Sequence, residues 1–337
     1  MLYLHNTAVY RRIEERLIMA RWGKPYKDRR NWPEYNEQLV VRGEFYLDLG
    51  FSKNWDSDLR KMNRTKRGGQ FEFPDSLIKW LVIWKQLVDY RGLEGITRKL
   101  HEYGLIPGYP DYTTIWNRIH DLVPEIRMPD YSDLYPGSDG TGLKTSNAGE
   151  YRVLKYGDPD ARRKRHLVVV ITADVRRKKI IGIEVYIEGK DHSEPDAARK
   201  HIKEAIGKGY RIREFFGDGA FDTNDMFAFL GIIGTKPVIK IRKNASTDRC
   251  RGSRFRRKTI REYREKGYGK WAEDNDYGMR WPGTEGIISA VKRKFGENTV
   301  SRSEEGLLAE GFQRFWSYDE IREYGERNVK MEMKVQD

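Results

Sequence analysis

The sequence predicts a mixed α/β fold preceded by a helical region. Between about residues 126 and 241, β-branched runs alternate with segments of helical periodicity. Before them, residues 1 to about 70 show weak periodicity, with one short helix and a cationic remainder, and residues 74–122 show a helical pattern. After residue 241 the chain becomes strongly basic, and a helix is expected again from Thr284 to Gly296, followed by a tail of one or two more helices. We therefore expect a helical, basic N-terminal region at 1–125, a mixed sheet covered by helices at 126–241, a basic insertion at 242–275 and further helices at 276–337.

The N-terminal region is rich in Arg, Lys, Trp and Tyr. Asp75 or Ser76 can cap one of its helices, and Pro110 and Asp111 precede another. The expected helices lie at about 9–20, 75–90, 93–103 and 112–122.

The last two of these helices resemble a helix-turn-helix, a motif that places its second helix in the major groove of DNA. That helix would present Thr113, Thr114, Asn117 and Arg118 to the base pairs. The connecting segment GLIPGYPD is longer than the usual turn of the motif. A packed helical domain that does not contact DNA is therefore an equally good interpretation.

Residues 126–241 predict the strands and helices of a mixed sheet. Two β-branched runs flank the charged turn Arg176-Arg177-Lys178, which indicates a hairpin. Because proline is excluded from the middle of a central strand, the first strand is expected to begin after Pro136. The strands are expected after residue 136 and at 166–175, 179–187, 212–216 and 235–241, and the helices at 191–208 and 224–230.

The basic insertion carries twelve lysines and arginines against three acidic residues within 242–270. Its apolar side chains are too few to close a core, so we expect a solvated arm or an insertion that follows nucleic-acid phosphates. The candidate phosphate-binding residues are Arg254, Arg256, Arg257 and Lys258.

The overall charge favours a polyanionic partner. The 337 residues include 64 Lys and Arg against 51 Asp and Glu, a formal net charge of +13. A single cysteine, Cys250, excludes intramolecular disulfides and cysteine-based zinc fingers. The start of the chain lacks a signal-peptide pattern, and no run reaches the length of a membrane span, so we expect a cytoplasmic, nucleoid-associated protein with no membrane attachment.

Three acidic residues are the candidates for chemistry: Asp139, Asp218 and Glu285. Carboxylates gathered without a cation repel one another by roughly 4 kcal/mol per close pair at an effective dielectric constant near 20, and a divalent metal would relieve this repulsion. On a helical wheel, Glu285, Ser289 and Lys292 share a stripe beside the apolar face of their helix. Taken singly, each acid is equally consistent with a turn or an ordinary amphipathic helix.

The remaining polar and aromatic candidates favour structural roles. The spacing of the six histidines, among them His166, His192 and His201, does not match a zinc site. Trp281 is interpreted as a buried aromatic anchor in preference to a residue that stacks on an unpaired base.

Three motifs link the acidic residues: DGTGLK at Asp139, GDGAFD at Asp218 and YGMRWPGTEGIISAVK around Glu285. With these motifs, and with the helical stretch upstream of Asp139, residues from about 35 to 312 resemble a DDE transposase of the insertion-sequence type, in the IS-four and IS-five-like group that carries a Y-R-E-K signature. The signature residues are Tyr277, Arg280, Glu285 and Lys292. Four residues separate Arg280 from Glu285 where the pattern usually has three, and the six between Glu285 and Lys292 fit it.

The resemblance implies an RNase H-like core in which Asp139, Asp218 and Glu285 hold two Mg²⁺ ions, with Mn²⁺ as a substitute. It implies metal-dependent cleavage of double-stranded DNA at terminal inverted repeats and transfer of the freed 3′-hydroxyl to target DNA. Lys292 and Arg280 would hold a phosphate, and Tyr277 would support it through its hydroxyl. Because two ends must be joined together, a homodimer on DNA is expected.

Two other functions remain open. A nuclease or junction resolvase with an RNase H-like core would share the metals and lack strand transfer. A DNA-binding protein derived from such an enzyme would retain the basic surface and have an inert core.

Overall fold

The computed structural model describes residues 31–122, 124–145, 166–187, 192–247 and 252–336. The helix predicted at 9–20 lies outside these residues. The described part divides into a smaller unit, made of residues up to 46 together with those from 322 onward, and a larger unit of 47–321. The smaller unit contains α2 (Trp32–Glu44) and the C-terminal end of the long helix α13 (Glu304–Gln336). Inside it, the rings of Phe45 and Tyr324 pack edge to face with their centroids 5.1 Å apart.

The larger unit begins with a group of helices. Its helices are α3 (Trp55–Asn63), α4 (Asp75–Lys85), α5 (Tyr90–Glu102) and α6 (Tyr112–Asp121), preceded by a 3₁₀ turn at Gly50–Asn54. An earlier 3₁₀ turn, Phe45–Leu47, lies where the chain passes from the smaller unit to the larger one. The helix predicted at 75–90 is wrong at its C-terminal end, because Asp89 caps α5 by accepting a hydrogen bond from the Gly92 amide at 2.7 Å. Asp111 caps α6 in the same way. No described helix has the length and apolarity needed to cross a membrane.

The central sheet has five strands in the order β4-β3-β2-β6-β7. Strands β2, β3 and β4 are antiparallel, while β6 and β7 run parallel to β2, so the expected mixed sheet is confirmed. The strands are β2 (Pro136–Lys144), β3 (His166–Asp174), β4 (Lys179–Ile187), β6 (Glu214–Gly217) and β7 (Lys236–Ile239). Two further short strands, β1 (Asp133–Leu134) and β5 (Arg211–Ile212), pair with each other in parallel.

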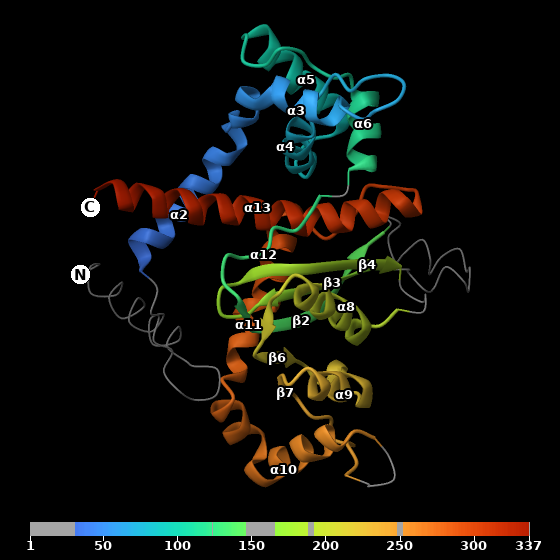
Figure 1. Ribbon diagram of the computed structural model, residues 1–337, viewed down its shortest axis with the longest axis vertical. Helices are drawn as coiled ribbons and strands as arrows, with labels where there is room; N and C mark the ends of the chain where they lie inside the picture. Colours follow the sequence, from blue (N-terminus) through green and yellow to red (C-terminus); the bar gives the residue numbers. More distant parts are fainter. Residues whose placement is uncertain (1–30, 123, 146–165, 188–191, 248–251, 337) are drawn as a thin grey trace, which may run out of the picture. The chain divides into compact units, whose positions relative to one another are not determined.

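Helices cover both faces of this sheet (Figure 1). On one face, α8 (Glu194–Gly207) buries Ala197 against Val170 of β3 and Tyr186 of β4. On the other, Gly311 of α13 lies against Leu167 and Val169. Since alternate residues of a strand point to opposite faces, β3 contributes side chains to the contact with α8 and to the contact with α13.

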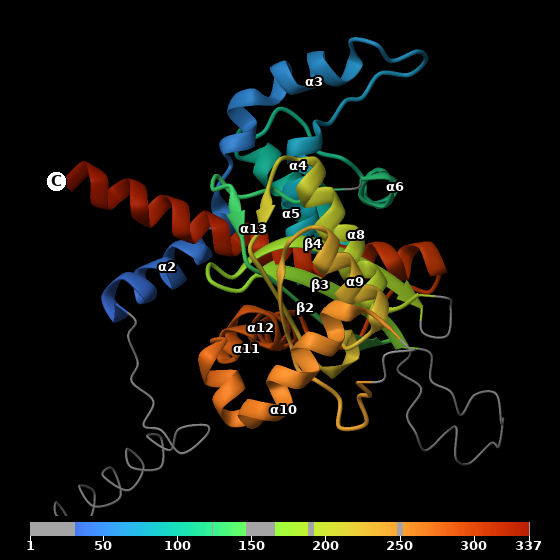
Figure 2. The ribbon, with the colours of Figure 1, turned by 60° about the horizontal axis from the view of Figure 1, so that its bottom comes forward.

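Helix α9 (Asn224–Ile232) lies on the same face as α8 (Figure 2). Both helices contribute to a core cluster that includes Phe215 of β6 and Ile260 of α10 (Arg254–Asp274). The prediction of a solvated arm at 242–270 is therefore wrong for the first part of α10, because this helix buries Thr259 and Ile260. The alternative, an insertion that follows nucleic-acid phosphates, stays a prediction. The chain then passes through a 3₁₀ turn at Tyr277–Met279 and α11 (Arg280–Gly283) to α12 (Glu285–Phe295), as predicted for the last helix before the tail.

Candidate active site

Asp139 and Asp218 lie on neighbouring parallel strands at matching positions. Strand β2 pairs with β6 through Gly137 and Phe216, and each aspartate follows its member of that pair by two residues. Asp218 lies just beyond β6 but keeps an extended backbone, with φ −82° and ψ −167°. Because adjacent strands lie about 4.8 Å apart and residues two apart share a face, both carboxylates project from the same face of the sheet.

Helix α12 approaches that face with its N-terminus. Thr284 is buried against β2, and a Cβ built on Gly137 would lie 3.2 Å from Thr284 Cγ2. Glycine at position 137 therefore permits the close approach. Glu285 is the first residue of α12, where the helix dipole favours a negative charge. The adjacent side of α12 is anchored by Ile287, Ile288 and Val291, as the helical wheel predicts.

The guanidinium of Arg280 lies between two of the carboxylates. Its Nη1 is 3.5 Å from Asp139 Oδ2, and its Nη2 donates a hydrogen bond to Glu285 Oε1. The Arg280 side chain is only 11% exposed, and Nη1 has no hydrogen-bond partner among the described residues. In this arrangement Arg280 faces the carboxylates, so a contact with DNA phosphate would require it to move.

Glu194 is a fourth carboxylate at the site and was missed in the sequence. It is the first residue of α8, directly after the N-cap Ser193. Its carboxylate lies against Gly140, because a Cβ built there would be 2.2 Å from Glu194 Oε1. The sequence Ser193-Glu194-Pro195 marks only the start of a helix, and no motif connects it with Asp139.

The electrostatics show that these acids are coupled. Burial raises the pKa of Asp139 to about 6, and Arg280 partly offsets this effect. The negative charges of Asp218, Glu285 and Glu194 add to the increase. Burial also raises the pKa of Glu194, with a further contribution from Asp218. Because neighbouring negative charges raise the pKa of Asp139 and of Glu194, a cation placed among these carboxylates would be stabilised.

The donor chemistry of the site fits Mg²⁺, which prefers carboxylate oxygens. The guanidinium of Arg280 already forms ion pairs with both Asp139 and Glu285. Within the described ranges, no three acidic, histidine or cysteine side chains form a ready-made set of metal ligands. Binding of a metal would therefore need side-chain rearrangement, in which the Arg280 guanidinium moves away from Asp139 and Glu285.

A groove of about 440 Å³ opens beside the carboxylates. Asp139 lines one side of it, and the stripe of Glu285, Ser289 and Lys292 lines the other. Lys292 Nζ is 3.7 Å from a carboxylate oxygen of Glu297, and its side chain is 22% exposed. A cation at this position suits a phosphate that enters the groove.

Two aromatic residues near Arg280 differ from their predicted roles. Tyr277 is buried, burial raises its pKa, and its hydroxyl donates a hydrogen bond to the Gly217 carbonyl oxygen at 3.2 Å. It therefore fixes the end of β6 beside Asp218, and its predicted support of a phosphate stays a prediction. The interpretation of Trp281 as a buried anchor is wrong, because its side chain is 44% exposed.

The predicted DNA-binding cations fall into two groups. Arg118 donates to the Phe73 carbonyl oxygen at 3.0 Å and pairs with Asp75 at 2.6 Å, so it holds the helical region together and is not turned toward a DNA groove. Arg256 is also engaged inside the protein, with Asp222. By contrast, Arg254 and Lys258 are exposed and Arg257 is partly exposed.

A buried polar chain lies behind the site. Ser138 Oγ and Thr172 Oγ1 are 2.7 Å apart, and Thr172 Oγ1 is 2.8 Å from His201 Nδ1. Burial lowers the pKa of His201 to about 4, so this histidine is neutral near pH 7. His192 is exposed. These two placements agree with the structural and surface roles expected of the histidines, and the side chain of His166 lies outside the described part.

No protein-family model matches the sequence. Among solved structures, the chain is similar to a chain in a cryo-EM structure of a simian T-cell lymphotropic virus intasome in complex with PP2A regulatory subunit B56 gamma, with 11% identity and a TM-score of 0.24 over 66% of this chain and 67% of that chain. It is also similar to a chain in the piggyBac transposase synaptic complex with hairpin DNA, with 13% identity and a TM-score of 0.31 over 88% of this chain and 79% of that one. TM-scores this low do not by themselves establish a fold or an activity.

Proposed function

We propose that the protein is a DDE transposase with an RNase H-like core, which cuts DNA at the ends of a mobile element and joins the freed 3′ ends to target DNA. The observation that carries the proposal is the convergence of Asp139, Asp218 and Glu285 from β2, the end of β6 and the N-terminus of α12. Further support comes from three antiparallel strands followed by two parallel ones in a single sheet, with a helix after each of β4 and β6.

In this proposal Asp139, Asp218 and Glu285 hold two Mg²⁺ or Mn²⁺ ions. When bound, such ions would stabilise the attacking and leaving oxygens of an in-line displacement at phosphorus. Arg280 neutralises Asp139 and Glu285. A metal held by these carboxylates would take over that role, and the guanidinium could then contact a DNA phosphate. Lys292, in the adjoining groove, holds a phosphate near the bond that is cut.

The proposed partners are duplex DNA bearing terminal inverted repeats, target DNA and a second copy of the chain, because two ends must be joined. Phosphate contacts should dominate affinity. With about six to ten such contacts, binding should weaken roughly 10³ to 10⁵-fold between about 50 and 200 mM salt.

The test incubates the protein with labelled duplexes that carry the DNA ends flanking its own gene, in Mg²⁺, Mn²⁺, Ca²⁺ or EDTA. Cleavage and strand transfer are expected in Mg²⁺ and Mn²⁺ and should disappear in Asp139→Ala, Asp218→Ala and Glu285→Ala while DNA binding persists. Asp196→Asn, an exposed carboxylate on α8, is the control. Cleavage without joining would favour the nuclease, and binding without cleavage would favour the inert DNA-binding protein. Cleavage by any of the three alanine variants would contradict the proposed site.

A further inference from the structure

The basic residues of α10 face two different directions. Arg254, Arg257, Lys258 and Arg261 follow the spacing i, i+3, i+4 and i+7, which places them on one side of a helix. Together with Glu262 and Glu265 they line a groove of about 590 Å³. Arg256 lies outside this set, and its side chain is only 15% exposed.

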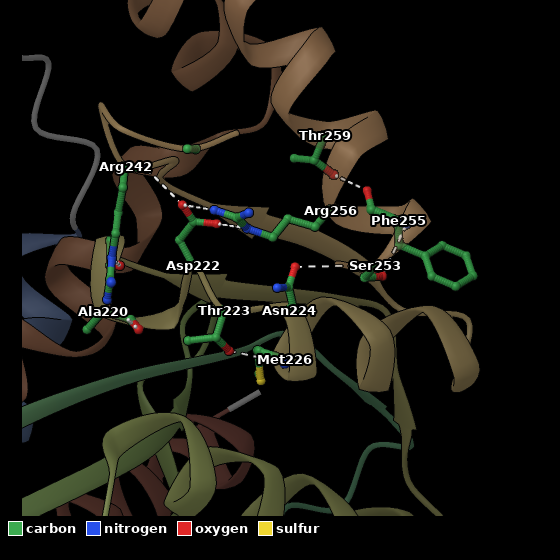
Figure 3. A network of polar contacts seen from close by, with 12 residues as sticks. Ala220, Asp222, Thr223, Asn224, Met226, Arg242, Ser253, Phe255, Arg256 and Thr259 are labelled. Carbon is green, nitrogen blue, oxygen red and sulfur yellow. Dashed lines mark hydrogen bonds and ion pairs between the residues drawn. The ribbon is translucent and has the colours of Figure 1, made fainter. Parts of the chain in front are cut away.

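Arg256 instead forms a two-point ion pair with Asp222 (Figure 3). Its Nε is 2.6 Å from Asp222 Oδ1, and its Nη2 is 3.1 Å from Oδ2. The backbone amide of Arg242 donates to the same Oδ2 at 2.9 Å. The Asp222 side chain is completely buried. Removing either partner of so enclosed a pair would leave a charge without its counterion.

The side chain of Arg242 also holds the turn between Asp218 and Asp222. The Arg242 side chain donates from Nε to the Gly219 carbonyl oxygen and from Nη2 to the Ala220 carbonyl oxygen, the latter at 3.2 Å. Within the turn, the Ala220 amide donates to Asp218 Oδ1 at 2.8 Å. A continuous series of polar contacts therefore leads from α10 through Asp222 to the carboxylate of Asp218.

We propose that the outward face of α10 binds the phosphate backbone of duplex DNA, and that the Asp222–Arg256 pair couples the position of α10 to the turn that carries Asp218. The four outward cations span about 10 Å at the α-helical rise, a length over which one DNA strand carries about three phosphates. Arg256 is then a positioning residue for Asp218 and not a DNA ligand. The significance of Asp218 rests on the proposed function, whereas the contact between α10 and DNA does not.

The DNA contact is tested by fluorescence anisotropy with a labelled duplex in Ca²⁺. Arg254→Gln/Lys258→Gln should weaken binding and reduce the slope of log affinity against log salt by roughly 0.9 for each phosphate that the variant no longer neutralises. The matched control is Lys203→Gln/Lys208→Gln, which removes the same charge from exposed positions at α8. Equal affinities and slopes for the two double variants would overturn the proposed surface.

The coupling is tested by hydrogen exchange at the Ala220 amide. In the wild type, added duplex should slow this exchange. Asp222→Asn should bind duplex with wild-type affinity yet lose the DNA-induced protection, and Arg256→Lys, which keeps the charge but not the two-point contact, should retain part of it. If Asp222→Asn fails to fold, the DNA-induced protection of Arg256→Lys is compared with that of the wild type instead.

Full DNA-induced protection in these variants would overturn the coupling, and so would a loss of affinity as large as that of Arg254→Gln/Lys258→Gln. Neither readout requires cleavage. A wild-type protein that never cuts DNA would therefore contradict the proposed function. The inference about α10 would still be decided by the anisotropy and hydrogen-exchange measurements alone.

Discussion

Arg280 and Asp139 form an ion pair within the candidate active site, with the guanidinium Nη1 3.5 Å from Asp139 Oδ2. Because the same guanidinium also binds Glu285, one largely buried cation offsets the repulsion between two carboxylates. A divalent ion held by those carboxylates would perform the same electrostatic role. Metal and Arg280 should therefore compete for one patch of negative charge.

This competition predicts the behaviour of Arg280→Gln. Without metal, the variant should lose about 1.5–3 kcal/mol in the free energy of unfolding, because charged hydrogen-bond partners are left unpaired. Added Mn²⁺ should raise its melting temperature more than that of the wild type. Urea denaturation in EDTA and thermal melts with Mn²⁺ measure both effects. Arg293→Gln, an exposed cation lining the same groove, is the control, and a metal-free stability equal to the wild type would refute the prediction.

Glu194→Gln should weaken metal binding by roughly 10–100-fold, the range seen for residues that support a metal site. Its stability without metal should not fall, because the change removes one of four mutually repelling charges. Calorimetric titration with Mn²⁺ measures the affinity. Asp196→Asn, two residues further along α8, should bind Mn²⁺ as the wild type does, because its carboxylate contacts Ser193 and Arg199. Unchanged affinity in Glu194→Gln would exclude it from the site.

The elements around the site were predictable because each has a strong local pattern. The β-branched runs flanking Arg176–Lys178 form the hairpin of β3 and β4, and the strand expected after Pro136 is β2, which begins at that residue. Glu194 was not predictable, because its role depends on Gly140, which is distant in the sequence and close in space. No local pattern encodes that contact.

Charge density misled the interpretation of α10. The segment was expected to be solvated because cations outnumber apolar residues, yet Ile260 and Trp271 are completely or almost completely buried. Ile260 and Trp271 lie on either side of a break at Gly267, where the backbone leaves helical geometry (φ 71°, ψ 160°), so no single helical period connects them in the sequence. The buried Asp222–Arg256 ion pair also holds α10 against the rest of the protein. Composition does not reveal which acid pairs with which base.

The ion pair between Lys179 and Asp319 anchors α13 to β4 in the larger unit, and both side chains are nearly inaccessible. Lys179→Met alone should cost roughly 3–5 kcal/mol of unfolding free energy, because it removes the ion-pair partner of a buried carboxylate. Lys179→Met/Asp319→Leu should recover most of that loss. Urea denaturation of the two variants and of Asp319→Leu forms a double-mutant cycle. Additive losses in the double variant would mean that the two residues do not interact energetically.

His201 should make the fold sensitive to acid. Burial lowers its pKa to about 4, whereas an unfolded chain has a histidine pKa of about 6.5. Between these values the unfolded state binds a proton that the folded state does not, so the free energy of unfolding falls as the pH drops from about 6.5 to about 4. At about 1.36 kcal/mol per pKa unit, the full loss is about 3 kcal/mol.

Urea denaturation at about pH 7 and about pH 4.5 tests this prediction against His201→Gln, which retains a polar group for Thr172. The wild type should lose more stability between the two pH values than the variant does. Asp139 titrates in the same range with the opposite sign, because its pKa is raised to about 6, and its contribution cancels when the two proteins are compared. Equal losses in both proteins would show that His201 does not control the acid sensitivity.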